Sequence, residues 1–128
     1  MQERLKELLK NSYSPYSNFK VAAIVVMKDG KEFNGVNVEN ASYGAAICAE
    51  RSAIVSAISN GYRNGDFKEL HVMVGSGKIG MPCFICRQVI SEMFEKNCAV
   101  YCYDTNGNVD KYTVEQICPY PFNSEDWR

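Results

Sequence analysis

The sequence predicts an α/β fold, in which helices pack against a β-sheet. Leu5, Leu8 and Leu9 recur among charged residues with the spacing of one helix face. Residues 21–27 form a nearly continuous run of β-branched and other apolar side chains, which is typical of a strand buried between helices. Helix-like and strand-like segments alternate along the 128 residues. We therefore expect one layered α/β domain that spans residues 1–128.

The expected elements follow one another without an internal repeat, a linker or a low-complexity segment. Asp29-Gly30, between two strand-like segments, predicts a hairpin turn. Gly61 is suited to end the helix before it, and Phe94 is expected on the buried face of the third helix. Helices are expected at 2–12, 47–60, 85–96 and, with a capped start, 113–116, and strands at 21–27, 32–38, 70–74, 99–103 and 109–112.

The composition is that of an ordinary globular protein with a formal net charge of −1. Its lysines and arginines are scattered, and the lack of a basic stripe argues against a nucleic-acid partner. The charged segment 1–6 has no apolar signal core, and no stretch approaches about 20 apolar residues, so we expect a cytoplasmic protein without a membrane segment. In that compartment, six cysteines favour metal binding or catalysis over disulfides.

Two short motifs supply candidate metal ligands at two predicted helix starts. Cys48-Ala49-Glu50 is the first, and Pro82-Cys83-Phe84-Ile85-Cys86 is the second. The C-x-x-C spacing places two sulfurs within one helical turn, and the helix and strand in between can return the chain to Cys48. Three thiolates can hold a zinc ion and leave its fourth position open. Helix N-termini favour the thiolate form, which is the form that binds zinc.

Charged neighbours complete the predicted site. Three thiolates leave zinc with a net charge of about −1, which makes it a poor Lewis acid unless nearby cations offset that charge. Arg51 and Arg87 each follow a ligand closely and are expected to support the ligands by donating to sulfur. The compensated metal would lower the pKa of its bound water towards about 7. Glu50 is the candidate catalytic residue, which would carry protons from this water to the substrate.

A ligand followed two residues later by glutamate, and then Pro-Cys-x-x-Cys, is the signature of zinc nucleobase deaminases. The sequence resembles the small cytidine deaminases, in the branch whose zinc ligands are all cysteines. The resemblance spans almost the whole chain. It is carried by the segments 37–43, 48–51 and 82–88 and, more weakly, by 15–19 and 118–122.

The resemblance implies a three-layer α/β/α sandwich with a mixed five-stranded sheet, and a homotetramer with shared active sites. It implies hydrolytic deamination of cytidine and deoxycytidine in pyrimidine salvage, in which a zinc-activated water attacks C4 and ammonia leaves. The substrate-binding residues that it implies are Asn37 and Glu39 for the ribose hydroxyls, Phe19 beside the base, Ala41 and Tyr43 for a neighbouring subunit's pocket, and Phe122 over the pyrimidine of another subunit.

The chain departs from the family pattern in two places. Phe84 stands where the family has glycine, and with Ile85 it alters the pocket wall near the leaving amino group. This keeps open a modified substrate, such as blasticidin S or an N4-substituted cytidine. Cys118 and Pro121 depart from the usual leucine-proline tail. The residues alone also allow a structural zinc or a redox pair in a binding module, although a structural zinc normally has four protein ligands.

Overall fold

The computed structural model describes residues 1–123 and 125. A mixed five-stranded sheet has the order β2-β1-β3-β4-β5; β3 and β4 are parallel, and the other neighbours are antiparallel. The strands are β1 (Val21–Met27), β2 (Glu32–Val36), β3 (Phe67–Val74), β4 (Phe94–Tyr103) and β5 (Val109–Thr113), and the helices are α1 (Gln2–Leu9), the short 3-10 helix η1 (Tyr43–Ala45), α2 (Ala49–Ser59), α3 (Phe84–Met93) and α4 (Val114–Ile117). Within the described residues, no helix is both long and apolar enough to cross a membrane.

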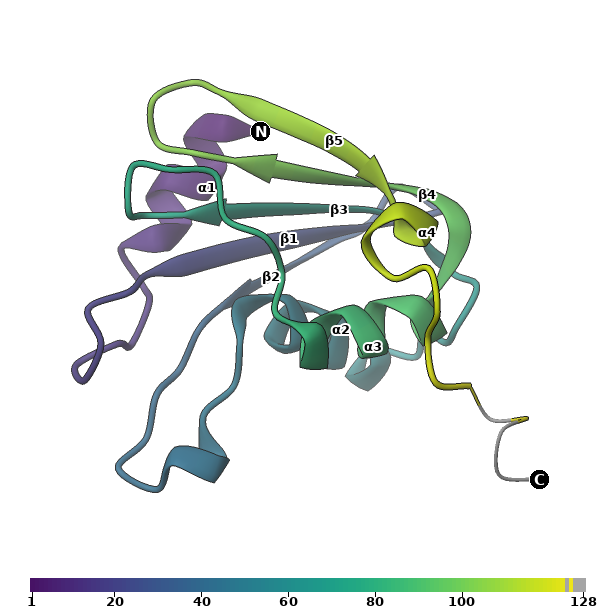
Figure 1. Cartoon of the computed structure of the whole chain (residues 1–128), viewed down its shortest axis with the longest axis horizontal. Coiled ribbons are helices and arrows are strands. Elements are labelled where there is room, and N and C mark those ends of the chain that lie inside the picture. Colours follow the sequence, from purple (N-terminus) through teal and green to yellow (C-terminus); the bar gives the residue numbers. More distant parts are fainter. Residues whose placement is uncertain (124, 126–128) are drawn as a thin grey trace.

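Helices cover both faces of the sheet (Figure 1), so the predicted three-layer arrangement is confirmed. Helices α2, α3 and α4 pack on one face, where Ala23 and Val100 join the larger core cluster. Helix α1 packs on the other face, where Leu5 meets Met73. Successive strand residues point to opposite faces, so the apolar run of β1 contributes to both cores at once. This double burial explains why residues 21–27 lack a polar alternation.

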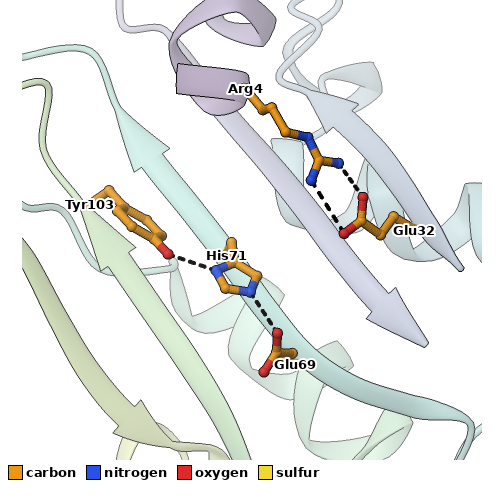
Figure 2. A network of polar contacts seen from close by, with 5 residues as sticks. All are labelled: Arg4, Glu32, Glu69, His71 and Tyr103. Carbon is orange, nitrogen blue, oxygen red and sulfur yellow. Dashed lines mark hydrogen bonds and ion pairs between the residues drawn. The ribbon is translucent and has the colours of Figure 1, made fainter. Parts of the chain in front are cut away.

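A polar network lies on the sheet face that α1 covers (Figure 2). The imidazole of His71 is buried, with Nδ1 2.8 Å from the Tyr103 hydroxyl and Nε2 3.1 Å from Glu69 Oε1. Arg4 of α1 forms an ion pair with Glu32 of β2. The chain's single histidine therefore belongs to the sheet, on the face opposite to α2 and α3.

The structure corrects several predicted boundaries: α1 ends at Leu9 rather than at residue 12, and β2 ends at Val36 rather than at residue 38. The third helix does not continue to residue 96: α3 ends at Met93, and β4 begins at Phe94. Phe94 pairs with Phe67 at the start of β3, and the two rings lie 4.9 Å apart between centroids. The apolar spacing of residues 89–94 suits a helix, but pairing with a strand distant in the sequence overrides that local preference. Strands β3 and β4 are consequently longer than expected.

Helix α2 lies close to β2 because Gly35 has no side chain. A Cβ at this position would lie 2.4 Å from both Ala49 O and Ala53 N. No side chain larger than hydrogen fits between this strand and the first turns of α2. The first turn of α2 carries Glu50 and is preceded by Cys48. This close packing therefore sets the distance of both residues from the sheet.

Candidate active site

Three thiols from two helix starts form one cluster. The Sγ atoms of Cys48, Cys83 and Cys86 all lie within 4.8 Å of one another, and among the described residues no fourth Cys, His or acidic side chain joins them. The Cys48 and Cys83 sulfurs are 3.7 Å apart. Zinc–sulfur bonds of about 2.3 Å in a tetrahedron require sulfurs about 3.8 Å apart. The cluster therefore fits a zinc ion that keeps one position for a ligand from outside the protein.

The surroundings of Cys48 favour its thiolate form. Cys48 is the N-cap residue of α2, and Cys83 is the N-cap residue of α3, so the positive ends of two helices face the sulfurs. Arg51 was expected to donate to a ligand, and its Nη2 lies 3.6 Å from Cys48 Sγ. Hydrogen bonds from Cys86 and from Arg51 lower the pKa of the Cys48 thiol to about 5. At neutral pH this sulfur is thus ready to bind a metal.

Arg87, also expected to donate to sulfur, has different recorded partners. Its Nε donates to Pro82 O at 2.7 Å, and its Nη1 donates to Ile117 O at 3.2 Å. The guanidinium carbon lies 4.2 Å from the centre of the Phe84 ring. Arg87 therefore contacts the backbone just before Cys83 and the end of α4, and it supports the site through the main chain.

Glu50 lies in the first turn of α2 and is only 4% exposed. Burial raises the pKa of its carboxyl to about 7, and the charge of the Cys48 thiolate acts in the same direction. Glu50 also lines the cavity that Cys48 and Cys83 line. A carboxyl with a pKa near 7 can both accept and release a proton at neutral pH, which is the property that a proton shuttle needs.

The cavity beside the thiols has a volume of about 490 Å³. Four of the predicted substrate residues line it, namely Phe19, Asn37, Glu39 and Tyr43. A second depression of about 610 Å³ lies at the other end of α2, around Tyr62, and contains none of the candidate residues. Two candidate zinc ligands, the candidate catalytic glutamate and four predicted substrate residues therefore line one cavity. Its size is suited to a small molecule.

Asn37 and Glu39 also organise the loop that precedes β1. The Asn37 amide donates to Phe19 O at 2.7 Å and accepts from Val21 N at 2.9 Å. The Glu39 carboxylate accepts hydrogen bonds from the backbone N–H and the hydroxyl of Ser17. The hydroxyl bond from Ser17 lowers the pKa of Glu39, which is therefore an anion able to accept further hydroxyl groups. Sequence reasoning missed Ser17, although it lies in the segment 15–19 that carries the resemblance.

The other two predicted substrate residues lie outside the cavity of their own chain. Ala41 and Phe122 do not line it, and the Phe122 residue is 59% exposed. Tyr43 lines the cavity yet is 81% exposed. Of the two bulky residues that depart from the family pattern, Ile85 lines the cavity and Phe84 does not. Several apolar side chains around the site thus remain available to another molecule.

A three-thiolate cluster beside a buried, proton-accepting carboxyl, on an α/β/α sandwich, defines the class of zinc-dependent hydrolases. Residues 1–102 match the family model described as "Cytidine and deoxycytidylate deaminase zinc-binding region". The chain belongs to this cytidine and deoxycytidylate deaminase family, and the cofactor of its three-thiol site is Zn²⁺.

The chain is similar over almost its whole length to curated and solved members of the family. It is 38% identical to a cytidine deaminase of Halalkalibacterium halodurans, over 98% of this chain and 96% of that protein. A crystal structure of the cytidine deaminase from Burkholderia pseudomallei matches with a TM-score of 0.89 and 42% identity, over 94% of each chain. A blasticidin-S deaminase of Bacillus cereus is 30% identical, over 80% of this chain and 76% of that protein.

Proposed function

We propose that this protein converts cytidine and deoxycytidine, with water, into uridine or deoxyuridine and ammonia. The single observation that supports this most is the juxtaposition of the three-thiol zinc site with the buried Glu50 carboxyl in one cavity. Family membership and the similarity to named cytidine deaminases agree with it. Pyrimidine salvage in the cytoplasm is the physiological setting that this activity suits.

The cavity residues divide into two groups with different tasks. The Glu39 carboxylate and the Asn37 amide line the cavity with polar groups, and we assign them to the ribose hydroxyls, which need hydrogen-bond partners in a desolvated site. Phe19 lines the same cavity and is 48% exposed, so its ring is available to flank the flat base. Recognition of the sugar thus directs the amino end of the base towards the thiols.

Cys48, Cys83 and Cys86 would hold the zinc ion, which when bound supplies a Lewis acid that makes water nucleophilic at neutral pH. Glu50 would accept the two protons of the attacking water in turn and deliver one to the pyrimidine ring nitrogen and the other to the amino group, which leaves as ammonia. Its pKa of about 7 leaves it able to do both in one turnover. Arg51 donates a hydrogen bond to the Cys48 sulfur and offsets part of the thiolate charge.

The assembly that we propose is a homotetramer in which subunits share active sites. Phe122 and Ala41 do not line the cavity of their own chain, so a substrate role for either requires a second copy. Exposed aromatic side chains on the tail and near the cavity, such as Tyr43, Phe84 and Tyr120, suit burial against another copy. Within this assembly, Phe122 would cover the base bound by a neighbouring subunit.

The direct test replaces Glu50 with glutamine, which keeps the size of the side chain and removes its acid–base function. We expect E50Q to keep zinc, measured by elemental analysis, and to lose at least about 100-fold in kcat for cytidine, followed by ultraviolet absorbance. The exposed Glu92 of α3 provides the matched control, E92Q, which should behave like the wild type. Normal turnover by zinc-loaded E50Q would refute the role of Glu50.

A substrate panel separates cytidine from its modified relatives. Because Ile85 lines the cavity and one relative is a blasticidin-S deaminase, the rates on cytidine, deoxycytidine, an N4-substituted cytidine and blasticidin S should be compared. We expect cytidine and deoxycytidine to be the best substrates. Inert cytidine, with turnover of one of the others, would contradict the proposed substrate while leaving the zinc chemistry in place.

A further inference from the structure

The side chain of Gln88, on α3, forms hydrogen bonds with both backbone polar groups of Phe122 in the C-terminal tail. Gln88 Nε2 donates a hydrogen bond to Phe122 O, and Phe122 N donates one to Gln88 Oε1 at 3.0 Å. The two partners are of opposite polarity, so together they fix the orientation of the amide. A side-chain amide thus does what a neighbouring strand would do for the backbone of Phe122.

The first residues of the tail can donate few backbone hydrogen bonds. Pro119 and Pro121 have no backbone N–H to donate, so residues 119–121 cannot pair along their length as a strand would. Tyr120 between them is 95% exposed. In Figure 1 the tail leaves α4 and runs past α3 toward the C-terminus. The Gln88 amide meets the tail one residue after the second proline, where a backbone N–H is again present.

These two hydrogen bonds attach the tail to α3, which also provides Cys86 and begins directly after Cys83. Gln88 lies two residues after Cys86 on α3, and its neighbour Arg87 ties Ile117 O, at the start of the tail, to Pro82 O. The backbone of Phe122 is therefore fixed relative to α3, while the residue stays 59% exposed. An exposed aromatic residue whose backbone is restrained by hydrogen bonds is suited to contact with a second molecule, because its backbone loses little further conformational entropy on binding.

We propose that Gln88 is a positioning residue, which places Phe122 for the nucleoside site of another copy and thereby sets the substrate affinity of that site. The inference rests on the proposed function, since Phe122 acts there on a bound pyrimidine. Gln88 touches no substrate itself. Its effect should appear in KM, should pass entirely through Phe122, and should leave the zinc content unchanged.

The experiment compares zinc-loaded wild type, Q88A, the isosteric Q88E, F122A and the double variant Q88A/F122A in cytidine turnover. Glutamate keeps the acceptor for Phe122 N, loses the donor for Phe122 O and adds a charge beside that carbonyl. The matched control is Q2A, which removes another glutamine amide bonded to a carbonyl, that of Gly107. Hydrogen exchange at the Phe122 amide is measured for the wild type, Q88A, Q88E and Q2A.

Loss of both hydrogen bonds in Q88A should raise KM about tenfold, with kcat changed less than about threefold. In Q88E, loss of the bond to Phe122 O and the added charge beside that carbonyl should also raise KM. The double variant should match F122A, because Gln88 acts only through that ring. The Phe122 amide should exchange faster in Q88A, which loses the acceptor for its N–H, and Q2A should change neither KM nor amide exchange.

Three outcomes would overturn the inference: an unchanged KM in Q88A, effects of Q88A and F122A that add, or a Phe122 amide that exchanges as in the wild type. An F122A variant with normal KM would also overturn it, although the deaminase function would stand. If the wild type itself fails to deaminate cytidine, the proposed function falls, and unchanged amide exchange in Q88A would still refute the positioning of the tail.

Discussion

At the scale of single residues, Arg51 supports the metal site by its contact with a zinc ligand. Its guanidinium reaches the sulfur of Cys48, the N-cap residue of α2, and its Nε is buried without a hydrogen-bond partner among the described residues. A neutral substitute would leave the thiolate charges of the site less compensated. Partners that lie outside the coordination sphere but orient the ligands are often worth 10- to 100-fold, roughly, in metal affinity.

We therefore expect R51Q to bind zinc about 10- to 100-fold more weakly than the wild type, measured by competition with a chromophoric chelator. The control is R63Q, because the Arg63 guanidinium donates to the carbonyls of Ile58 and Tyr62 at the far end of α2. Equal zinc affinities for R51Q and the wild type would show that Arg51 does not support the metal site.

At the scale of elements, the site depends on how closely α2 approaches the sheet. Gly35 of β2 faces the first turns of the helix, and its lack of a side chain permits contact between the two backbones. Cys48 and Glu50 take their positions from this packing, while Cys83 and Cys86 take theirs from α3. The geometry of the thiol cluster is thus set by the packing of two helices on one sheet face.

Substitution of Gly35 by alanine should destabilise the protein by about 1–3 kcal/mol, because the new Cβ would lie within 2.4 Å of the α2 backbone and the helix must move. The measurement is urea unfolding of the zinc-loaded protein. G44A is the matched control, since a Cβ at Gly44 would meet nothing within 4 Å, and its free energy of unfolding should stay within about 0.5 kcal/mol of the wild type. A G35A variant as stable as G44A would contradict the close packing.

At the scale of the whole molecule, the pH dependence of stability should carry a signature of His71. Burial lowers the pKa of this imidazole from its ordinary 6.5, although the hydrogen bond that His71 donates to Glu69 opposes the change. The folded state then binds fewer protons than the unfolded state. The stabilising contribution is complete above the ordinary pKa and is lost as the pH falls through 6.5 towards the lower folded value.

H71Q, which cannot titrate, should therefore lose less stability than the wild type between about pH 7.5 and 5.5, by at most about 1.4 kcal/mol per pH unit. The measurement is the free energy of unfolding of both zinc-loaded proteins at each pH, so that the metal site and the carboxylates cancel in the difference. His71 is the chain's single histidine, and no other imidazole contributes. Parallel curves for the two proteins would contradict the prediction.

Subunit sharing is also a property of the whole assembly. We expect the protein to elute at about four times its chain mass of 14.4 kDa. In mixed oligomers of E50Q and F122A, E50Q subunits should lend Phe122 to sites that retain Glu50, so part of the activity should return with a KM near that of the wild type. Oligomers of F122A with the double variant E50Q/F122A are the control and should show no such recovery. A monomer, or no recovery in the first mixture, would refute sharing through Phe122.

The sequence by itself determined the features that depend on short spacing: the order of strands and helices, the thiols of Cys83 and Cys86 one turn apart, and Glu50 two residues after Cys48. One helical turn or one strand period is enough to place such groups relative to each other. Only the tertiary structure decided that α3 gives way to β4 at Phe94, that Arg87 contacts backbone carbonyls, and that Gln88 holds the tail. Each of these features depends either on a partner that is distant in the chain or on which of several nearby partners a side chain contacts. Local periodicity does not specify which partner tertiary packing brings close.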